Sequence, residues 1–187
     1  MEKKIAGLDL AALPKNKSGV CLLREKPEFF ILYSDEEILS FFENVRPDIV
    51  AIDAPLMEEI KVRKADLLLK KYGAMPPTMQ GMKILTERAS KLVKKLNCKV
   101  IEVFPTATAK IIGVYDKKWQ KMAEKLGINA KSKHELDAYL AAYTAYLYLI
   151  GKAEEVGEEE KVIVPKKIKK FKFTFPYIPY AKGDGNK

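Results

Sequence analysis

Three aspartates stand in segments that are otherwise built for burial. Asp9 interrupts the apolar segment 5–12, Asp53 ends the apolar run 49–52, and Asp137 lies near the start of a segment made almost entirely of apolar or small residues. An unpaired carboxylate in such a place costs several kcal/mol or becomes protonated. If the first two segments are parallel neighbouring strands, Asp9 and Asp53 end at the same edge of a sheet, where α/β folds place ligands. A cation shared by all three carboxylates would compensate them.

Two more side chains could join this group. His134 lies one helical turn before Asp137, so both project from one face of a helix. Glu102 lies in a third apolar run, 99–104, and is a reserve ligand. Each acid also has a structural alternative. A strand-end Asp can cap a turn, a first-turn Asp or His can favour the helix dipole or face solvent, and Glu102 can pair with a lysine.

The elements that must position these residues follow from the apolar pattern. Three strand-like runs open the chain as an antiparallel meander, and two short continuous apolar runs are typical of strands covered on both faces. We expect strands at 3–10, 18–24, 28–33, 48–52 and 99–104, with a further edge strand at 162–164. Capping boxes at 34–37 and 132–135 mark two helix starts. We expect helices at 35–44, 82–96, 106–112, 116–126 and 133–150, and a partly helical insertion at 54–80.

Composition limits the class of protein without identifying a ligand. The 187 residues suit one domain, no apolar run is long enough for a membrane span, and the two cysteines are expected to be reduced core thiols in a cytoplasmic protein. The net charge is +9, but residues 165–187 carry +6 of it, which leaves +3 for residues 1–164. Charge alone therefore does not establish nucleic-acid binding.

The succession of motifs resembles the ribonuclease H-like superfamily, in which Asp lies in strand one, an acid ends strand four, and Asp lies on the last helix. Asp9-Leu-Ala, His134 and Asp137-Ala-Tyr-Leu-Ala-Ala142 look like the RuvC-type Holliday-junction resolvase branch. A family of predicted RNase H-like nucleases (DUF429) is similar in the motifs at 7–11, 51–55, 63–66, 102–105 and 133–138. The resemblance implies an α/β, ribonuclease H-like fold over residues 1–164. It has a five-stranded mixed sheet of order 3-2-1-4-5 flanked by helices, the insertion at 54–80, and a basic aromatic tail at 165–187.

The resemblance further implies metal-dependent hydrolysis of phosphodiester bonds in DNA or RNA. The cofactor would be Mg²⁺ or Mn²⁺, which prefer oxygen ligands. Asp9 would bridge two ions, Asp53 would bind one, and Asp137, with Glu102, would complete the other. His134 would be a ligand or a proton carrier. Arg63 and Lys64 are candidates for contacting substrate phosphate, with a solvated helix as the alternative.

Two other classes of protein remain as alternatives. An actin-like kinase or ATPase would need a second domain and further glycine-rich phosphate loops, and the turn after Asp9 offers only Gly19. A non-catalytic nucleic-acid-binding module would use the tail, whose aromatic residues could stack on bases: Phe171, Phe173, Phe175, Tyr177 and Tyr180. The same alternation of Lys and Phe is also typical of an edge strand.

Overall fold

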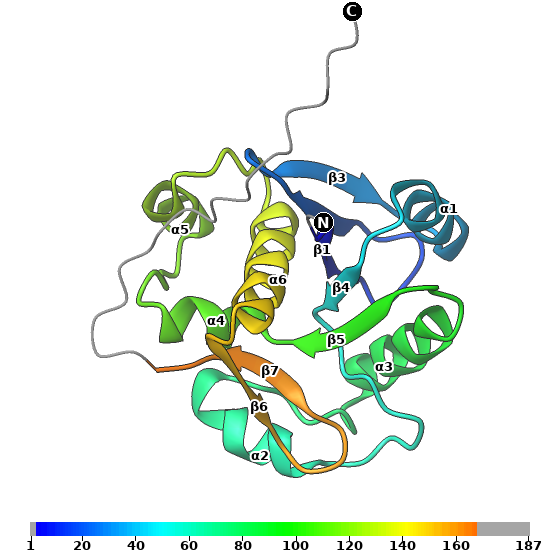
Figure 1. Ribbon diagram of the computed structural model, residues 1–187. Coiled ribbons are helices and arrows are strands. Elements are labelled where there is room, and N and C mark those ends of the chain that lie inside the picture. Colours follow the sequence, from blue (N-terminus) through cyan, green and yellow to red (C-terminus); the bar gives the residue numbers. More distant parts are fainter. Residues whose placement is uncertain (1–2, 168–187) are drawn as a thin grey trace, which may run out of the picture.

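One mixed sheet organises the chain, as seen in the computed structural model, which describes residues 3–167 (Figure 1). The strand order is β3-β2-β1-β4-β5-β7-β6. β1, β2 and β3 form an antiparallel meander, β1, β4, β5 and β7 run parallel, and β6 returns antiparallel to β7. The strands are β1 (Ile5–Asp9), β2 (Ser18–Leu23), β3 (Glu28–Leu32), β4 (Ile49–Ile52), β5 (Lys99–Val103), β6 (Ala153–Val156) and β7 (Val162–Pro165).

The expected five-stranded sheet needs a correction, because the sheet has seven strands. The order 3-2-1-4-5 holds for the first five, and β7 and β6 extend the sheet beyond β5. The apolar run at 162–164 was expected to lie at an edge, but it pairs on both sides, with β5 and with β6. β6 carries two exposed glutamates in its four residues and therefore has no apolar run by which sequence could reveal it.

The helices begin close to the predicted positions. Ser34 and Ser132 cap the starts of two of them, each hydroxyl accepting a hydrogen bond from the backbone N–H three residues on, at 3.1 and 3.2 Å. Within the described residues, no helix is long and apolar enough to cross a membrane. The helices are α1 (Asp35–Val45), α2 (Lys64–Leu69), α3 (Gln80–Val93), α4 (Pro105–Ile111), α5 (Trp119–Leu126) and α6 (Lys133–Leu149), with a 3-10 helix, η1 (Lys70–Tyr72).

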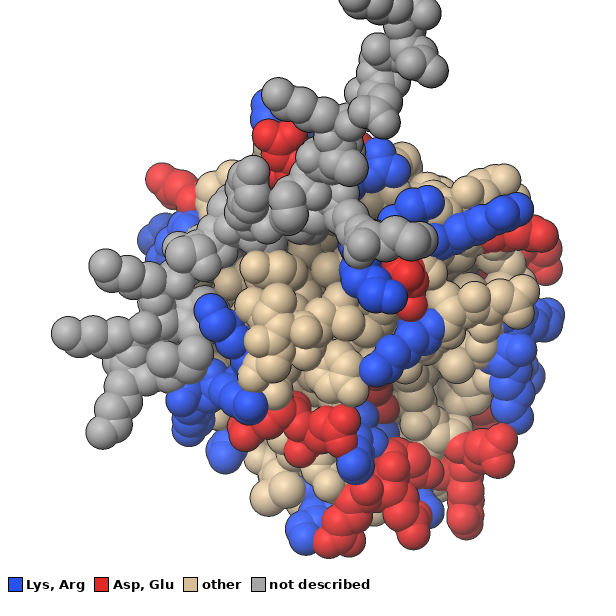
Figure 2. All heavy atoms as spheres, in the orientation of Figure 1, with Lys and Arg blue, Asp and Glu red and all other residues tan. Residues whose placement is uncertain are grey.

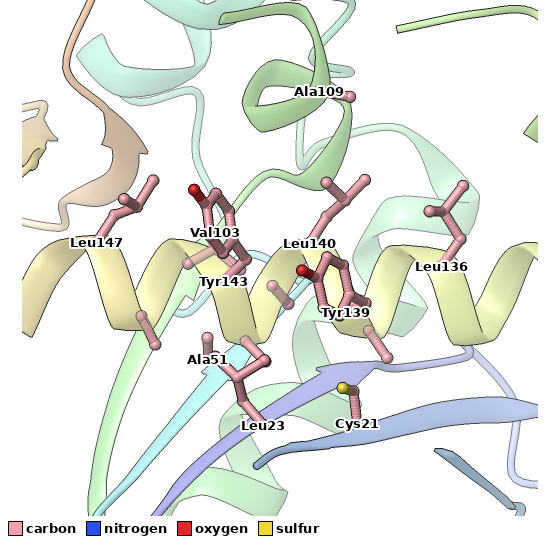
Figure 3. Packing of buried hydrophobic residues seen from close by; sticks show 14 of the residues in the cluster. Cys21, Leu23, Ala51, Val103, Ala109, Leu136, Tyr139, Leu140, Tyr143 and Leu147 are labelled. Atoms are coloured by element: carbon pink, nitrogen blue, oxygen red, sulfur yellow. The ribbon is translucent and has the colours of Figure 1, made fainter. Parts of the chain in front are cut away.

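The helices cover both faces of the sheet. Because side chains alternate along a strand, Ile5 contributes to the core under α6, α4 and α5, whereas Ala6 contributes to the core under α1 and α3. Figure 3 shows Cys21 and Ala51 of the sheet beneath helix α6. The strand residues that share this face with Ile5 are therefore aimed at α6.

Helix α6 lies unusually close to the sheet because glycines face it. A Cβ atom at Gly7 in β1 would lie 2.0 Å from the carbonyl oxygen of Ala138 and 2.4 Å from the amide nitrogen of Ala142. At Gly19 in β2, a Cβ atom would lie 2.2 Å from the carbonyl oxygen of His134. Both contacts are with helix backbone, which cannot rotate aside. The chain therefore tolerates only glycine at these two positions in this packing.

We predict that Gly7→Ala lowers the free energy of unfolding by about 3 kcal/mol or prevents folding, because the added methyl overpacks a backbone-to-backbone contact. Urea denaturation followed by circular dichroism measures the change. Gly81→Ala is the matched control, because a Cβ atom at Gly81 in α3 meets nothing within 4 Å. Alanine favours a helix, so the control should be neutral or slightly stabilising. Equal effects at the two positions would show that α6 does not rest on β1.

Candidate metal centre

Neighbouring strands bring Asp9 and Asp53 together. Asp9 ends β1 and Asp53 directly follows β4, and these parallel strands pair Leu8 with Ile52. The backbone N–H of Asp53 continues the pairing by donating to the Leu8 carbonyl oxygen at 2.9 Å. Both aspartates lie two residues after positions that face α6, namely Gly7 and Ala51, so both point toward that helix.

Helix α6 supplies the other members of the group from its first turns. His134 Nδ1 lies 2.7 Å from Asp9 Oδ2, and 45% of the histidine side chain is exposed. Asp137 is buried and forms an ion pair with Lys133 of the preceding turn. The carboxylate of Asp53 is only partly exposed, and within residues 3–167 no hydrogen bond or ion pair reaches it. The structure thus gathers Asp9, Asp53, Asp137 and His134 around the ends of β1 and β4.

Burial raises the pKa of all three carboxylates, and the charge of a neighbouring acid raises it further at Asp9 and Asp53. Burial raises the pKa of Asp9, and the charge of Asp137 raises it further, against the opposing hydrogen bond from His134. The pKa of Asp53 is raised well above its usual range by burial and then by the charges of Asp9 and Asp137. Burial also raises the pKa of Asp137, while the ion pair with Lys133 lowers it. The group carries more negative charge than its surroundings stabilise.

The side chains do not form a ready-made metal cage. Among the described residues, no group of three His, Cys, Asp or Glu side chains is arranged to hold a metal ion. Two of the three carboxylates are engaged by neighbours on α6, Asp9 by His134 and Asp137 by Lys133. The donor chemistry nevertheless suits Mg²⁺ or Mn²⁺, because these ions bind carboxylate oxygens and Asp53 has no competing partner in the described part of the chain.

Glu102 and Arg63 are placed differently from the roles considered for them. Arg63 is 6% exposed, and its guanidinium donates to both oxygens of Glu102 at 2.7 Å and to Asp66 at 2.8 Å. Glu102 Oε2 also accepts a hydrogen bond from the backbone N–H of Leu56 at 2.7 Å. The guanidinium is thus engaged by two buried carboxylates inside the protein, and both Glu102 oxygens already accept hydrogen bonds. Burial raises the pKa of Glu102, opposed by Arg63.

This buried ion-pair group ties the 54–80 segment to β5. It therefore shapes the wall of the site, because Arg63, Asp66 and Glu102 all line the same cleft as Asp9 and Asp53. Lys64, the other candidate for phosphate contact, is exposed and pairs with Glu158 of the β6–β7 turn at 2.5 Å. Its cation is on the surface, but on the side of the 54–80 segment that faces β6 and β7.

Two hollows adjoin the aspartates. The cleft that contains Asp9 and Asp53 has a volume of about 300 Å³, and apolar side chains including Met75, Met82 and Leu85 line the rest of it. A second, more open hollow of about 580 Å³ lies beyond His134, in the turn between β1 and β2, and contains Lys15 and Lys17. Elsewhere, on the face shown in Figure 2, basic and acidic side chains of the described residues are interspersed.

The site includes three lysines that sequence reasoning missed. Lys133 could have been found from its spacing, because it lies four residues before Asp137 in the helix that carries it. Lys15 and Lys17 lie in a short polar turn, and nothing in that turn's sequence distinguishes them from other surface lysines. Their place beside His134 depends on how β2 packs under α6.

Comparison with solved structures identifies the fold. T. thermophilus RuvC in complex with a Holliday junction substrate has a TM-score of 0.52 and 12% identity over 80% of this chain and 96% of that one. A second Thermus thermophilus RuvC structure has a TM-score of 0.50 and 11% identity over 79% of this chain and 97% of that one. The fold is that of RuvC. No protein-family model and no curated protein sequence matches the chain, so membership of the DUF429 family stays a prediction.

Asp53→Asn is predicted to stabilise the metal-free protein at neutral pH. A raised folded-state pKa means that the folded protein holds this proton more tightly than the unfolded chain does. The carboxyl therefore contributes no penalty below its ordinary pKa of about 4, and a growing one as the pH rises toward its folded value. The melting temperature in chelator should be higher for Asp53→Asn than for wild type at pH 7, and the two should converge near about pH 4.

Asp48→Asn is the matched control at the opposite end of β4. The backbone N–H of Lys4 donates to Asp48 Oδ2 at 2.7 Å and lowers the pKa of Asp48. Its charge therefore stabilises the fold above its unfolded pKa, and that contribution is lost as the pH falls through the folded value. Asp48→Asn should lower the melting temperature at pH 7. A lower melting temperature for Asp53→Asn as well would contradict the prediction of an uncompensated acid there.

Proposed function

We propose that this protein is a nuclease that hydrolyses phosphodiester bonds in nucleic acid with the help of Mg²⁺ or Mn²⁺. The observation that carries the proposal is the Asp53 carboxylate, which lies beside Asp9 and Asp137 without a partner within residues 3–167. A buried acid with a purely structural role normally has a hydrogen-bond or ion-pair partner, because an uncompensated charge in a protein interior costs several kcal/mol. Three neighbouring acids with raised pKa values, two at strand ends and one on α6 of a RuvC-like fold, are typical of a site that a cation completes.

In this proposal Asp9, Asp53 and Asp137 hold the metal ions through carboxylate oxygens. When bound, the ions would polarise the phosphate, activate a water molecule and stabilise the leaving oxygen. Asp9 and Asp53 are fixed by neighbouring strands, and Asp137 by a helix that rests on the same strands. The ligands therefore sit on rigid elements, which keeps their positions defined.

In this proposal His134 carries the proton. With the proton on Nδ1, the ring donates to Asp9 Oδ2, and the contact fixes the orientation of the imidazole. Nε2 then has a free lone pair in a side chain that is 45% exposed, so water can reach it. His134 can accept a proton from attacking water on that nitrogen, or it can itself be a metal ligand.

The charges around the site restrict how a polyanion approaches. The cleft that contains Asp9 and Asp53 is also lined by Asp66 and Glu102, and Arg63, its cation, is already paired with both. A phosphate backbone would be repelled there unless metal ions neutralise the acids. The hollow beyond His134 contains Lys15 and Lys17 instead, so we propose that the nucleic-acid strand approaches the acids from this side.

We predict that Asp9→Asn lowers the rate of metal-dependent cleavage by about 100-fold or more, because it removes a charged ligand worth several kcal/mol in a metal-assisted step. Wild type and variant should be compared on single-stranded, duplex and branched DNA and RNA, with Mg²⁺ or Mn²⁺ and with chelator. The variant should still bind nucleic acid, since its basic residues are unchanged. Asp48→Asn is the control, because Asp48 lies at the far end of β4.

The outcomes of that assay separate the enzyme from the non-catalytic alternative. Cleavage by Asp9→Asn at the wild-type rate, or cleavage in chelator, would assign the activity to another site. Wild type that binds nucleic acid but never cuts it would favour a binding module with structural acids.

Lys15→Ala and Lys17→Ala should each weaken nucleic-acid binding and reduce the slope of log affinity against log salt by about 1, because one fewer phosphate contact releases fewer counterions. Fluorescence anisotropy over a salt series measures both quantities. Lys26→Ala serves as the control, since Lys26 is exposed in the β2–β3 turn at the other end of β2. A slope that changes equally for Lys26→Ala would remove the β1–β2 turn from the interface.

A further inference from the structure

The first turn of α6 provides a reason why three neighbouring acids do not form a metal-ready group. Lys133 Nζ pairs with Asp137, and His134 Nδ1 contacts Asp9. Both cation-forming side chains come from consecutive positions of one helix. Each of them occupies a carboxylate oxygen that a metal ion would need.

Lys133 is bound to the acids rather than to the helix surface. Its side chain is 64% exposed and the Asp137 side chain is 8% exposed, so the ammonium reaches from solvent to a buried carboxylate. Partial burial lowers the pKa of Lys133, but Asp137 and then the charges of Asp9 and Asp53 raise it above its ordinary value. Among the described residues Lys133 thus pairs with Asp137 alone, while its charge also acts on Asp9 and Asp53.

The two side chains differ in what they can do when a metal arrives. A neutral histidine has a lone pair and can remain as a ligand, whereas an ammonium group has three donors and no acceptor and can only repel the ion. The Lys133 side chain is flexible and largely exposed, so it can turn into solvent without disturbing the core.

We propose that the Lys133 ammonium is a tethered counter-ion that takes the place of a divalent cation at Asp137 and must be displaced when Mg²⁺ or Mn²⁺ binds. This inference rests on the proposed function. Lys133 thereby stabilises the metal-free fold and weakens the affinity for metal, so that the same side chain sets both properties.

The test is the affinity for Mn²⁺, measured by isothermal titration calorimetry without nucleic acid. Lys133→Met and Lys133→Gln remove the competing charge, and each should bind Mn²⁺ about tenfold more tightly than wild type, as expected for one unit charge acting on a divalent ion at a partly exposed site. Lys133→Arg keeps the charge and should bind like wild type. Lys131→Met is the control, because it removes a positive charge only two residues before Lys133. Lys131 is exposed, and no ion pair of its side chain is found in the described residues.

The melting temperature is a second measurement. A lysine with a structural role alone would change it equally with and without metal. In chelator, Lys133→Met should melt at a lower temperature than wild type, because Asp137 loses its counter-ion. In saturating Mn²⁺ the two melting temperatures should converge, since the tighter site of the variant gains more from the ion and Lys133 of wild type no longer pairs with Asp137. Lys131→Met should show neither change.

Two results would overturn the inference, and they differ in what they say about the proposed function. If wild type binds Mn²⁺ and the neutral variants bind it equally or more weakly, Lys133 does not compete with the metal, and the proposed function stands. If neither wild type nor any Lys133 variant binds Mn²⁺, both the inference and the metal-dependent function are overturned.

Discussion

The contact between helix α6 and the two glycines of the sheet is the constraint on which the rest of the structure depends. At Gly7 and Gly19 the helix backbone meets the strand backbone with no room for a methyl group. This fixes the height of α6 above β1 and β2 and its rotation about its own axis. Because His134 and Asp137 belong to the end of α6 that crosses Gly19, the same contact delivers them to Asp9. The candidate site is therefore a consequence of how the core packs.

The site also shows how a fold tolerates acids that destabilise it. Burial raises the pKa of Asp9, Asp53 and Asp137, neighbouring acids raise it further at Asp9 and Asp53, and among the described residues the groups that oppose these shifts, Lys133 and His134, belong to α6. In the same cleft the Asp66 and Glu102 carboxylates are compensated, because both accept hydrogen bonds from the Arg63 guanidinium. The contrast between a satisfied and an unsatisfied acidic group a short distance apart is what distinguishes a structural ion pair from a candidate ligand site.

The parts that sequence could predict are those that local chemistry determines. The capping boxes at Ser34 and Ser132 start helices where expected, and the apolar run before Asp53 indicated a central parallel strand beside Asp9. The burial of Arg63 could not be foreseen, because it depends on how the 54–80 segment folds back onto β5. β6 escaped notice because an edge strand with two glutamates in four residues has no apolar signature. The roles of the acids themselves stay predictions, since they concern a metal and a substrate.

The hydrogen-bonding contact between Asp9 and His134 joins residues 125 positions apart, near opposite ends of the folded chain. Such a contact closes a very long loop, so the strand end at Asp9 must wait for α6 before it gains its partner. During synthesis, β1 to β5 emerge well before α6 does, and in that interval the acids of β1 and β4 have neither His134 nor Asp137 beside them. His134 and Asp137, half of the cluster, are thus absent from the early nascent chain. The order of translation keeps the site incomplete until the fold is nearly finished.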